Sequence, residues 1–326
     1  MSFEHLTPDQ MINAAEEATG IGFTGFTAQL PSYINRVYEF QTRDGLRLIA
    51  KFYRPGRWSK NAILDEHTFL QELSEAELPV ITPIKLANGE TLGTHDEILF
   101  AIFPKKAGRQ LEINNFEDWL RLGTLVARIH NIGASHAARS RVVLSPDNST
   151  RNDLDYLLSN VIPAAYRTSY RNLVNELIDI STPLFSRTEQ IRIHGDLHRG
   201  NILDRMEEGL LIIDFDDMAM GPAVQDLWLL LPDRLDKSRE ETALFIEGYE
   251  QFRDFDFKTL QLIEPLRAMR MIYFLAWCSR QINDHQFRRN FPDWGTDSFW
   301  HKEINDLSEQ MGFVRDSVKN DHNFGR

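Results

Sequence analysis

The chain has 326 residues, which is enough for two lobes and a sizeable apolar core. Hydrophobic residues make up 42% of it and charged residues 26%, so a soluble globular protein is expected and a disordered one is not. The formal net charge of −12 disfavours a general nucleic-acid binder, because phosphate contacts need a basic surface. It leaves room for a local basic pocket that takes one small anion.

The single cysteine, Cys278, excludes an internal disulfide and fits a reducing compartment. Its apolar neighbours favour a buried small side chain over a catalytic thiol. The polar, acidic N-terminus lacks the basic start and apolar core of a signal peptide. The most apolar stretch near the C-terminus, PLRAMRMIYFLAWCSR, is too short and too charged to span a bilayer. We therefore expect a cytoplasmic protein with neither a membrane nor a nucleic-acid partner.

The first hundred residues predict a small β-rich region. Two runs of β-branched, aromatic and apolar residues flank the turn signal Asp44-Gly45 and predict a hairpin. Helical periodicity and Pro8 near a helix start predict the other elements. The expected elements are a helix at 8–18, strands at 34–41 and 46–53, a helix at 61–78, and strands at 80–86 and 97–104.

Helices dominate after the stretch PKKAGRQ, which has the composition of a connector. One β-rich interruption divides them. The expected helices cover 116–131, 152–161, 165–180, 222–231, 239–254 and 258–283, and the expected strands cover 191–193, 202–204 and 210–214. This order predicts a β-rich lobe, a hinge near 103–109 and a larger helical lobe. A ligand cleft is expected between the lobes.

Two polar stretches flanked by apolar residues, IHGDLHRGNIL and LIIDFDD, predict an anchored site. In the first, Asp196 and Asn201 lie in a loop between strands and can aim their side chains into one space. The carboxylate can accept a proton from an attacking hydroxyl, and the amide oxygen can bind a hard cation such as Mg²⁺. Asp214 directly follows an apolar strand and adds a charged oxygen ligand, while Asp216 and Asp217 lie in the exit turn. This set suits phosphoryl transfer.

Two other interpretations of the first stretch stay open. His194 and His198 are four residues apart, as in zinc motifs, but that spacing serves a helix. Gly195 disfavours a helix here and the glutamate of HExxH is absent, so we expect the histidines to hold the loop by hydrogen bonds. A tight structural turn, capped by its own Asp and Asn, is the second alternative.

Lys51 and Glu66 form a second polar set. Lys51 lies in the second hairpin strand on the same face as Ile49 and Tyr53, and a half-buried lysine needs a partner. Glu66 in the next helix can supply it, with Glu72 as a second candidate. The pair resembles the lysine–glutamate pair that positions nucleotide phosphates in kinases. The alternative is a surface lysine and a solvated glutamate.

The segment PSYINRVYEF precedes Lys51 without any GxGxxG motif. Ser32 and Asn35 offer a hydroxyl, an amide and nearby backbone N–H groups, and a tight loop can bind phosphate without glycines. Ser32 can equally cap a turn. Its hydroxyl is also a candidate for self-modification.

Several stretches resemble a known family. HGDLHRGNIL followed by IIDFDD resembles the aminoglycoside phosphotransferase and choline kinase group, relatives of the protein kinases. LGTLVARIH, SYINRVYEF and GPAVQDLW resemble other segments of that group, and the resemblance implies that Asp226 supports the catalytic loop. KFYRPGRW and EPLRAMRMIYFLAW resemble a bacterial subgroup of serine/threonine protein kinases that act in a stress response. This resemblance covers residues 30–300.

The resemblance implies a bilobal, kinase-like α+β fold. Residues 1–103 are the implied nucleotide-binding lobe and residues 104–326 the implied catalytic and substrate lobe. ATP and Mg²⁺ are the implied cofactors, and the implied partner is a protein with a serine or threonine acceptor. A small-molecule kinase for an amino alcohol, sugar or aminoglycoside is the first alternative, and a non-catalytic nucleotide-binding scaffold is the second.

The resemblance also implies roles for individual residues. Those roles are Asp196 as catalytic base, Asn201 and Asp214 as Mg²⁺ ligands, Lys51 with Glu66 at the ATP phosphates, Ser32 in the phosphate loop, and the backbone of residues 101–103, including Phe103, at the adenine. The sequence has no activation segment ending in Ala-Pro-Glu. Control by activation-loop phosphorylation is therefore not expected.

Overall fold

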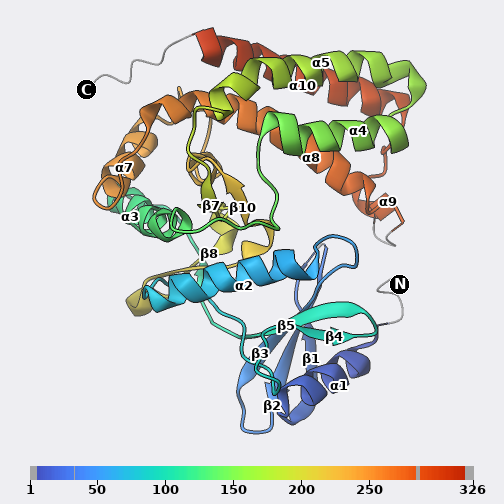
Figure 1. Cartoon of the computed structure of the whole chain (residues 1–326), viewed down its shortest axis with the longest axis vertical. Helices are drawn as coiled ribbons and strands as arrows, with labels where there is room; N and C mark the ends of the chain where they lie inside the picture. Colours follow the sequence, from blue (N-terminus) through green and yellow to red (C-terminus); the bar gives the residue numbers. More distant parts are fainter. Residues whose placement is uncertain (1–5, 33, 284–286, 320–326) are drawn as a thin grey trace.

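The computed structural model describes residues 6–32, 34–283 and 287–319. A five-stranded antiparallel sheet occupies the first third of the chain, in the order β1-β2-β3-β5-β4 (Figure 1). Its strands are β1 (Phe23–Gln29), β2 (Arg36–Thr42), β3 (Arg47–Phe52), β4 (Gly93–His95) and β5 (Ile98–Pro104). The predicted hairpin is confirmed as β2 and β3, and Gly45 takes the positive φ of 90° that its turn requires.

Two parts of the sheet differ from the prediction. The strand expected at 80–86 is wrong, since only Val80 makes an isolated bridge there, to Ile212. Pro79 and Pro83 explain this, because proline cannot donate a ladder hydrogen bond. The sheet gains β1 and β4 instead, which were not predicted. β1 is mostly exposed and β4 has three residues, so neither shows a clear apolar alternation.

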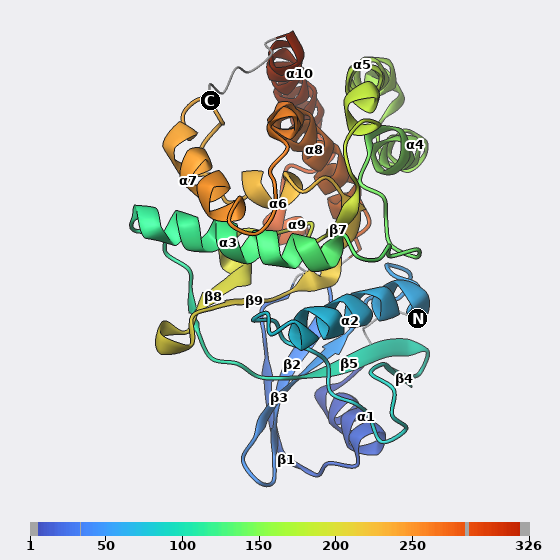
Figure 2. The same cartoon turned by 60° about the vertical axis from the view of Figure 1, so that its left-hand side comes forward.

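Two helices belong to this part of the chain, and both begin at a capping residue. In α1 (Pro8–Thr19) the side chain of Thr7 accepts a hydrogen bond from the backbone of Gln10. In α2 (Lys60–Glu75) Ser59 does the same for Ala62. α1 packs with the sheet in one apolar core. Figures 1 and 2 both show α2 between the sheet and the helices that follow.

Helices dominate the remainder, as predicted. They are α3 (Phe116–Gly133), α4 (Arg151–Asn160), α5 (Ala164–Phe185), α6 (Gln225–Trp228), α7 (Arg239–Tyr249), α8 (Ile263–Ser279), α9 (Phe287–Asn290) and α10 (Asp297–Lys319). The helix expected at 222–231 is only α6, and the one expected at 258–283 starts as a 3-10 helix before α8. α9 and α10 were not predicted. α10 packs against α5 and α8 through residues such as Trp300 and Met311.

Short strands interrupt the helices at the three predicted places, and two further strands, at 109–110 and 219–221, were not predicted. β7 (Ile191–Ile193) pairs with β10 (Ala219–Gly221), and β8 (Ile202–Asp204) pairs with β6 (Arg109–Gln110) and β9 (Leu210–Ile212). These strands frame both polar motifs. The large apolar core of this part also includes Phe69, Leu70 and Leu73 of α2, so α2 packs against the helical part.

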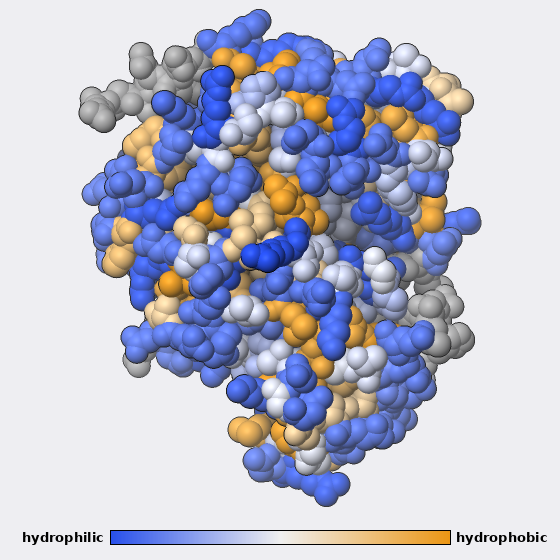
Figure 3. All heavy atoms as spheres, in the orientation of Figure 1, coloured by the Kyte–Doolittle hydropathy of each residue, from blue (hydrophilic) through white to orange (hydrophobic). Residues whose placement is uncertain are grey.

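The overall composition of elements confirms a mixed α+β architecture. The predicted lobe boundary after residue 103 stays a prediction; β5 ends at Pro104, β6 follows, and the helices begin with α3 at Phe116. Hydrophilic residues predominate on the face shown in Figure 3. No helix in the described ranges is long and apolar enough to cross a membrane. Cys278 is fully buried, and burial raises the pKa of its thiol to about 12, which agrees with a packing role.

Candidate active site

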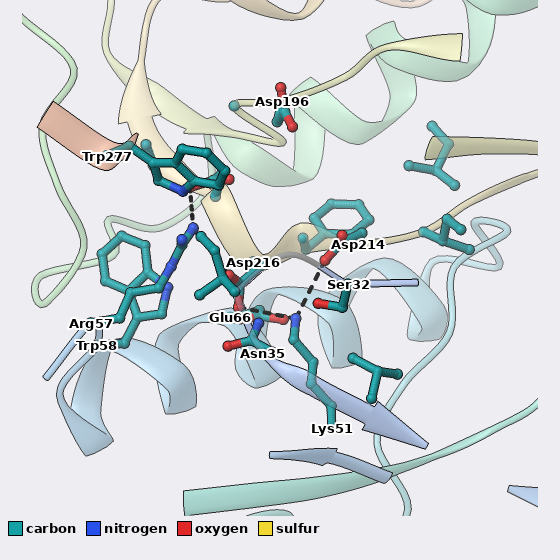
Figure 4. Close-up of a pocket in the computed structure, with 18 of the residues that line it drawn as sticks. Ser32, Asn35, Lys51, Arg57, Trp58, Glu66, Asp196, Asp214, Asp216 and Trp277 are labelled. Atoms are coloured by element: carbon teal, nitrogen blue, oxygen red, sulfur yellow. Dashed lines mark hydrogen bonds and ion pairs between the residues drawn. The ribbon is translucent and has the colours of Figure 1, made fainter. Parts of the chain in front are cut away.

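A cavity of about 750 Å³ opens between the sheet and the helical part of the molecule. The loop between β1 and β2, strand β3, the end of β5, both polar motifs and helix α8 line it (Figure 4). Six predicted site residues are among its lining: Ser32, Lys51, Glu66, Phe103, Asp196 and Asp214. The fold thus brings together residues that are up to 182 positions apart, from Ser32 to Asp214 (214 − 32).

Asn201 is the exception, since it is not part of this lining. Its backbone carbonyl accepts a hydrogen bond from the N–H of Ile213, at 3.0 Å, directly before Asp214. Its side-chain amide donates to the backbone carbonyl of Asp196, also at 3.0 Å. Asn201 therefore joins the two motifs. Its side-chain N–H group is used in the bond to Asp196, whereas its amide oxygen is the atom suited to bind a cation.

Asp226 holds the loop that carries Asp196. Its buried carboxylate accepts hydrogen bonds from the backbone N–H groups of His194 and Gly195, at 2.8 and 2.9 Å. It also lies 3.0 Å from Nε2 of His130. Burial disfavours the carboxylate, but these hydrogen bonds and His130 outweigh it and lower the pKa of Asp226. Asp226 therefore holds this loop in a fixed position.

Gly195 is required by the shape of this loop. Its φ is 84°, and a Cβ atom there would lie 2.2 Å from the carbonyl oxygen of Asp217. Only glycine combines that backbone conformation with such a close approach. The second motif can therefore pass directly beside the first.

The two histidines of the loop are used in its own hydrogen bonds. Nε2 of His194 lies 2.9 Å from the carbonyl oxygen of Ile213. Nδ1 of His198 accepts from the N–H of Gly200 at 3.0 Å. Within the described part of the chain, no group of three or more His, Cys, Asp or Glu side chains could hold a metal ion.

Lys51 pairs with two aspartates of the second motif. Its Nζ lies 3.3 Å from Oδ1 of Asp214 and 3.0 Å from Oδ1 of Asp216 (Figure 4). Burial opposes the charge on Lys51, but the two carboxylates outweigh it and raise the pKa of Lys51 well above its ordinary value. The lysine is therefore charged and ready for an anionic ligand.

Glu66 forms its ion pair with an arginine, and its negative charge also raises the pKa of Lys51. Oε2 of Glu66 lies 2.6 Å from Nη2 of Arg141, in a pair whose side chains are almost completely buried. The second candidate, Glu72, pairs with Arg192 at 2.6 Å. Among the described residues, Lys51 thus forms ion pairs with aspartates and Glu66 forms one with an arginine. Glu66 nevertheless lines the same cavity.

The three aspartates of the second motif differ sharply in exposure. The side chain of Asp216 is 8% exposed, whereas that of Asp214 is 56% exposed. Arg57, from the loop after β3, lies 3.1 Å from Asp216 and 2.7 Å from Asp217. Asp214 has a φ of 61°, in the left-handed region that non-glycine residues adopt infrequently. It is the aspartate that remains accessible.

Asn201 and Asp214 fit a hard divalent cation. Both offer oxygen donors, and Mg²⁺ commonly takes one or two protein oxygens and completes its shell with phosphate and water. Asp214 is exposed toward the cavity, and the backbone hydrogen bond at Ile213 holds Asn201 next to it. These residues could hold the ion beside nucleotide phosphates that contact Lys51.

The loop between β1 and β2 contributes one exposed and one buried polar residue. Ser32 is exposed and lines the cavity. Asn35 is 7% exposed, and its side-chain oxygen accepts from the N–H of Arg54 at 3.1 Å. Asn35 therefore shapes the loop, and Ser32 is the side chain of the two that is free to meet a ligand in the cavity.

Sequence reasoning missed three arginines of this site: Arg57, Arg141 and Arg270. Nη2 of Arg270, on α8, lies 2.8 Å from Oδ1 of Asp196. KFYRPGRW and PLRAMR, two stretches singled out for their resemblance, contain Arg57 and Arg270. The resemblance was thus the available signal for these two, and nothing in the local spacing pointed to Arg141.

Comparison with known proteins decides the family. A family model described as "Phosphotransferase enzyme family" matches residues 27–263. The chain belongs to this family. The phosphotransferase is also 37% identical over 324 residues to stress response kinase A of Escherichia coli (strain K12), which covers 97% of this chain and 95% of that protein. A relative from Salmonella typhimurium, named serine/threonine protein kinase RdoA, is 37% identical over 325 residues with the same coverage.

Solved structures support the fold of this phosphotransferase. Amicoumacin kinase in complex with AMP-PNP, Ca²⁺ and Ami superposes with a TM-score of 0.75 at 19% identity, over 93% of each chain. A microcompartment-associated aminopropanol kinase gives 0.70 at 16% identity, over 96% of this chain and 98% of that one. The predicted kinase-like fold and the resemblance are confirmed. The phosphotransferase is an ATP-dependent kinase.

Proposed function

We propose that this kinase transfers the γ-phosphoryl group of ATP, with Mg²⁺, to serine or threonine hydroxyls of proteins in a stress response. The observation that carries this proposal is one cavity that holds both Asp196 and the Lys51–Asp214 pair. Figure 4 shows Asp196 set apart from that pair within the site. The names of the two relatives that match nearly the whole chain support a protein acceptor and the stress response.

Each predicted residue has a role in this proposal. Asp196 orients the acceptor hydroxyl and takes its proton, while Lys51 holds the phosphates in line. Bound Mg²⁺, held by Asn201 and Asp214, would neutralise phosphate charge. Ser32, in the loop between β1 and β2, contacts the phosphates, and the backbone around Phe103 holds the adenine.

Glu66 takes an indirect role in the same scheme. Through Arg141 it fixes α2 and the turn after Asp214, because Nη1 of Arg141 also donates to the carbonyl of Asp216 at 2.7 Å. Residues 1–103 and 104–326 then act as the nucleotide-binding lobe and the catalytic and substrate lobe. The proposed location is the cytoplasm, in keeping with the free, buried Cys278.

The charges of the cavity favour a protein acceptor over a cationic small molecule. Every described carboxylate of the lining already has a cationic partner: Glu66 with Arg141, Asp153 with Arg280, Asp196 with Arg270, Asp214 with Lys51, and Asp216 and Asp217 with Arg57. An aminoglycoside or amino alcohol would have to displace these cations before its ammonium groups could pair with the carboxylates. α8 adds apolar and aromatic lining, including Met269, Tyr273 and Phe274.

The proposal is tested by offering γ-labelled ATP in parallel to the kinase alone, to generic protein substrates and to a panel of amino alcohols, sugars and aminoglycosides. We expect label on phosphoserine or phosphothreonine after acid hydrolysis of the protein fraction. Rapid phosphorylation of one metabolite, with no label on protein, would replace the protein acceptor by a small molecule.

A further inference from the structure

Arg270 reaches the candidate catalytic carboxylate from α8. Its Nη2 lies 2.8 Å from Oδ1 of Asp196, and its side chain is 39% exposed and lines the cavity. This ion pair uses one nitrogen of a planar group that carries five N–H donors. The guanidinium can therefore hold Asp196 and bind a second anion at the same time.

The two buried cations of the cavity lining pair elsewhere. Lys51, whose side chain is 11% exposed, pairs with Asp214 and Asp216. Arg57, at 12% exposure, pairs with Asp216 and Asp217. Within the described ranges, Arg270 is the arginine that is paired with Asp196. It is therefore the cation placed to act where the acceptor hydroxyl meets the phosphoryl group.

The helix holds Arg270 in a defined position. Leu266 and Met269 are buried in the apolar core on the same helix. One turn beyond Arg270, the hydroxyl of Tyr273 donates to Oδ1 of Asp217 at 3.2 Å. These contacts fix the register of α8 against the second motif, so the guanidinium is in place before a substrate arrives.

A cation is needed between Asp196 and the γ-phosphoryl group because these two anionic groups must approach each other during transfer. The acceptor hydroxyl lies between the Asp196 carboxylate and the γ-phosphoryl group when the groups are aligned for transfer. The carboxylate and the phosphoryl oxygens carry like charges and therefore repel each other. A guanidinium that contacts both offsets this repulsion and stabilises charge on the transferred group.

We propose that Arg270 is a catalytic residue that bridges Asp196 and the phosphoryl group during transfer, an inference that rests on the proposed role of Asp196. In this step the acceptor oxygen forms a bond to the γ-phosphorus. The bond from that phosphorus to the β,γ-bridging oxygen breaks, and its electron pair leaves with ADP. The hydroxyl proton passes to Asp196, and Arg270 donates hydrogen bonds to the non-bridging γ-oxygens.

The test compares R270Q and R270K with the control R315Q. Arg315 lies on α10, is 40% exposed, and forms a bidentate pair with Glu176 at 2.7 and 2.8 Å, so it resembles Arg270 in exposure and in having a carboxylate partner. For each variant the affinity for Mg-ADP is measured with and without aluminium fluoride, which mimics the phosphoryl group in transfer. Thermal unfolding confirms that each variant is folded.

We expect R270Q to weaken binding of the ADP–aluminium fluoride complex about 10- to 100-fold, in line with the loss of one preorganised donor. Its affinity for ADP alone should stay within about twofold of wild type, and R315Q should change neither value. R270K should lose less than R270Q, because lysine keeps the charge and lacks the planar fork. Equal binding of the mimic by R270Q and wild type would overturn the proposal, as would an equal loss for ADP alone.

This readout needs no acceptor, so it separates the inference from the proposed function. Failure to label any protein would overturn the protein acceptor, while the binding of the mimic would still decide the role of Arg270. If R270Q binds the mimic as tightly as wild type does, and wild type labels protein normally, only the proposed role of Arg270 is overturned. If R270Q does not fold, the same comparison with R270K decides, since a loss below about twofold would then contradict the proposal.

Discussion

Arg141 and Glu66 form a buried ion pair that ties the helical part of the molecule to α2, with 2.6 Å between Nη2 and Oε2. Arg141 also donates to the carbonyl oxygens of Ala62 and Asp216, and it packs over the ring of Trp58 at 4.5 Å. One guanidinium thus fixes α2 and the turn after Asp214. Arg141 is therefore the arginine that anchors α2 through Glu66.

Arg141→Met tests the contribution of this pair to stability. Removing the guanidinium leaves a buried carboxylate without its partner, so the free energy of unfolding should fall by about 3–5 kcal/mol. Urea unfolding at pH 7 measures the change. Arg315→Met, which breaks the exposed pair with Glu176, serves as the control and should cost at most about 1 kcal/mol. Similar decreases in the free energy of unfolding for the two variants would show that burial does not determine how much the Arg141–Glu66 pair stabilises the protein.

Asp214→Ala is expected to remove the Mg²⁺ dependence of nucleotide binding. The accessible carboxylate of Asp214 is the charged oxygen donor that the cavity offers, whereas Asp216 is held by Lys51 and Arg57. The measurement is a titration of Mg²⁺ against a fluorescent ATP analogue. Asp217→Asn is the control, and it should retain the Mg²⁺ dependence. If Asp214→Ala retains it too, the metal is bound by another residue.

His67 makes stability depend on pH. Burial, Lys51 and Arg141 lower the pKa of His67 to about 3, and its ring bonds to Tyr53 and Thr91. The unfolded chain protonates this histidine near pH 6.5 and the folded chain does not, so stability falls as pH drops from about 6.5 toward 3. The loss approaches about 1.4 kcal/mol per pH unit from this group. Stability measured at pH 7, 6 and 5 should fall less steeply in His67→Gln, and parallel slopes would contradict this assignment.

Ser32 is expected to contact nucleotide phosphate directly. Ser32→Ala should weaken ATP binding by about 0.5–1.5 kcal/mol, the usual contribution of one hydrogen bond. Ser32→Asp should weaken it further, because a negative charge would then stand beside the phosphates, as a phosphate on Ser32 itself would. Isothermal titration with a non-hydrolysable analogue measures both values. Equal affinities for wild type and both variants would remove Ser32 from the site.

The polar motifs were predictable because their chemistry is encoded locally. Asp196 and Asn201 share one loop, Asp214 follows an apolar strand, and the Asp44-Gly45 turn marks the hairpin that carries Lys51. Residue type, spacing and the flanking apolar runs were sufficient for these predictions, without any knowledge of the tertiary contacts.

The partners of these residues were not predictable in the same way. Glu66 and Arg141 are 75 positions apart, and Arg270 is 74 positions from Asp196 (270 − 196). Such pairs depend on how α2 and α8 rotate about their own axes when they pack, which no local pattern reports. α10 was missed although the sequence carries its signal, since Trp300, Ile304, Leu307, Met311 and Val314 recur at helical spacing.

Transfer of label from γ-labelled ATP by wild type and Asp196→Asn tests the central claim most directly. The neutral isostere keeps the shape of the side chain and removes the base, so the rate of serine and threonine phosphorylation should fall about 10²- to 10⁴-fold. The affinity for Mg-ATP, measured on the same preparations, should be unchanged. Labelling by Asp196→Asn at the wild-type rate would contradict the assignment of Asp196 as the base.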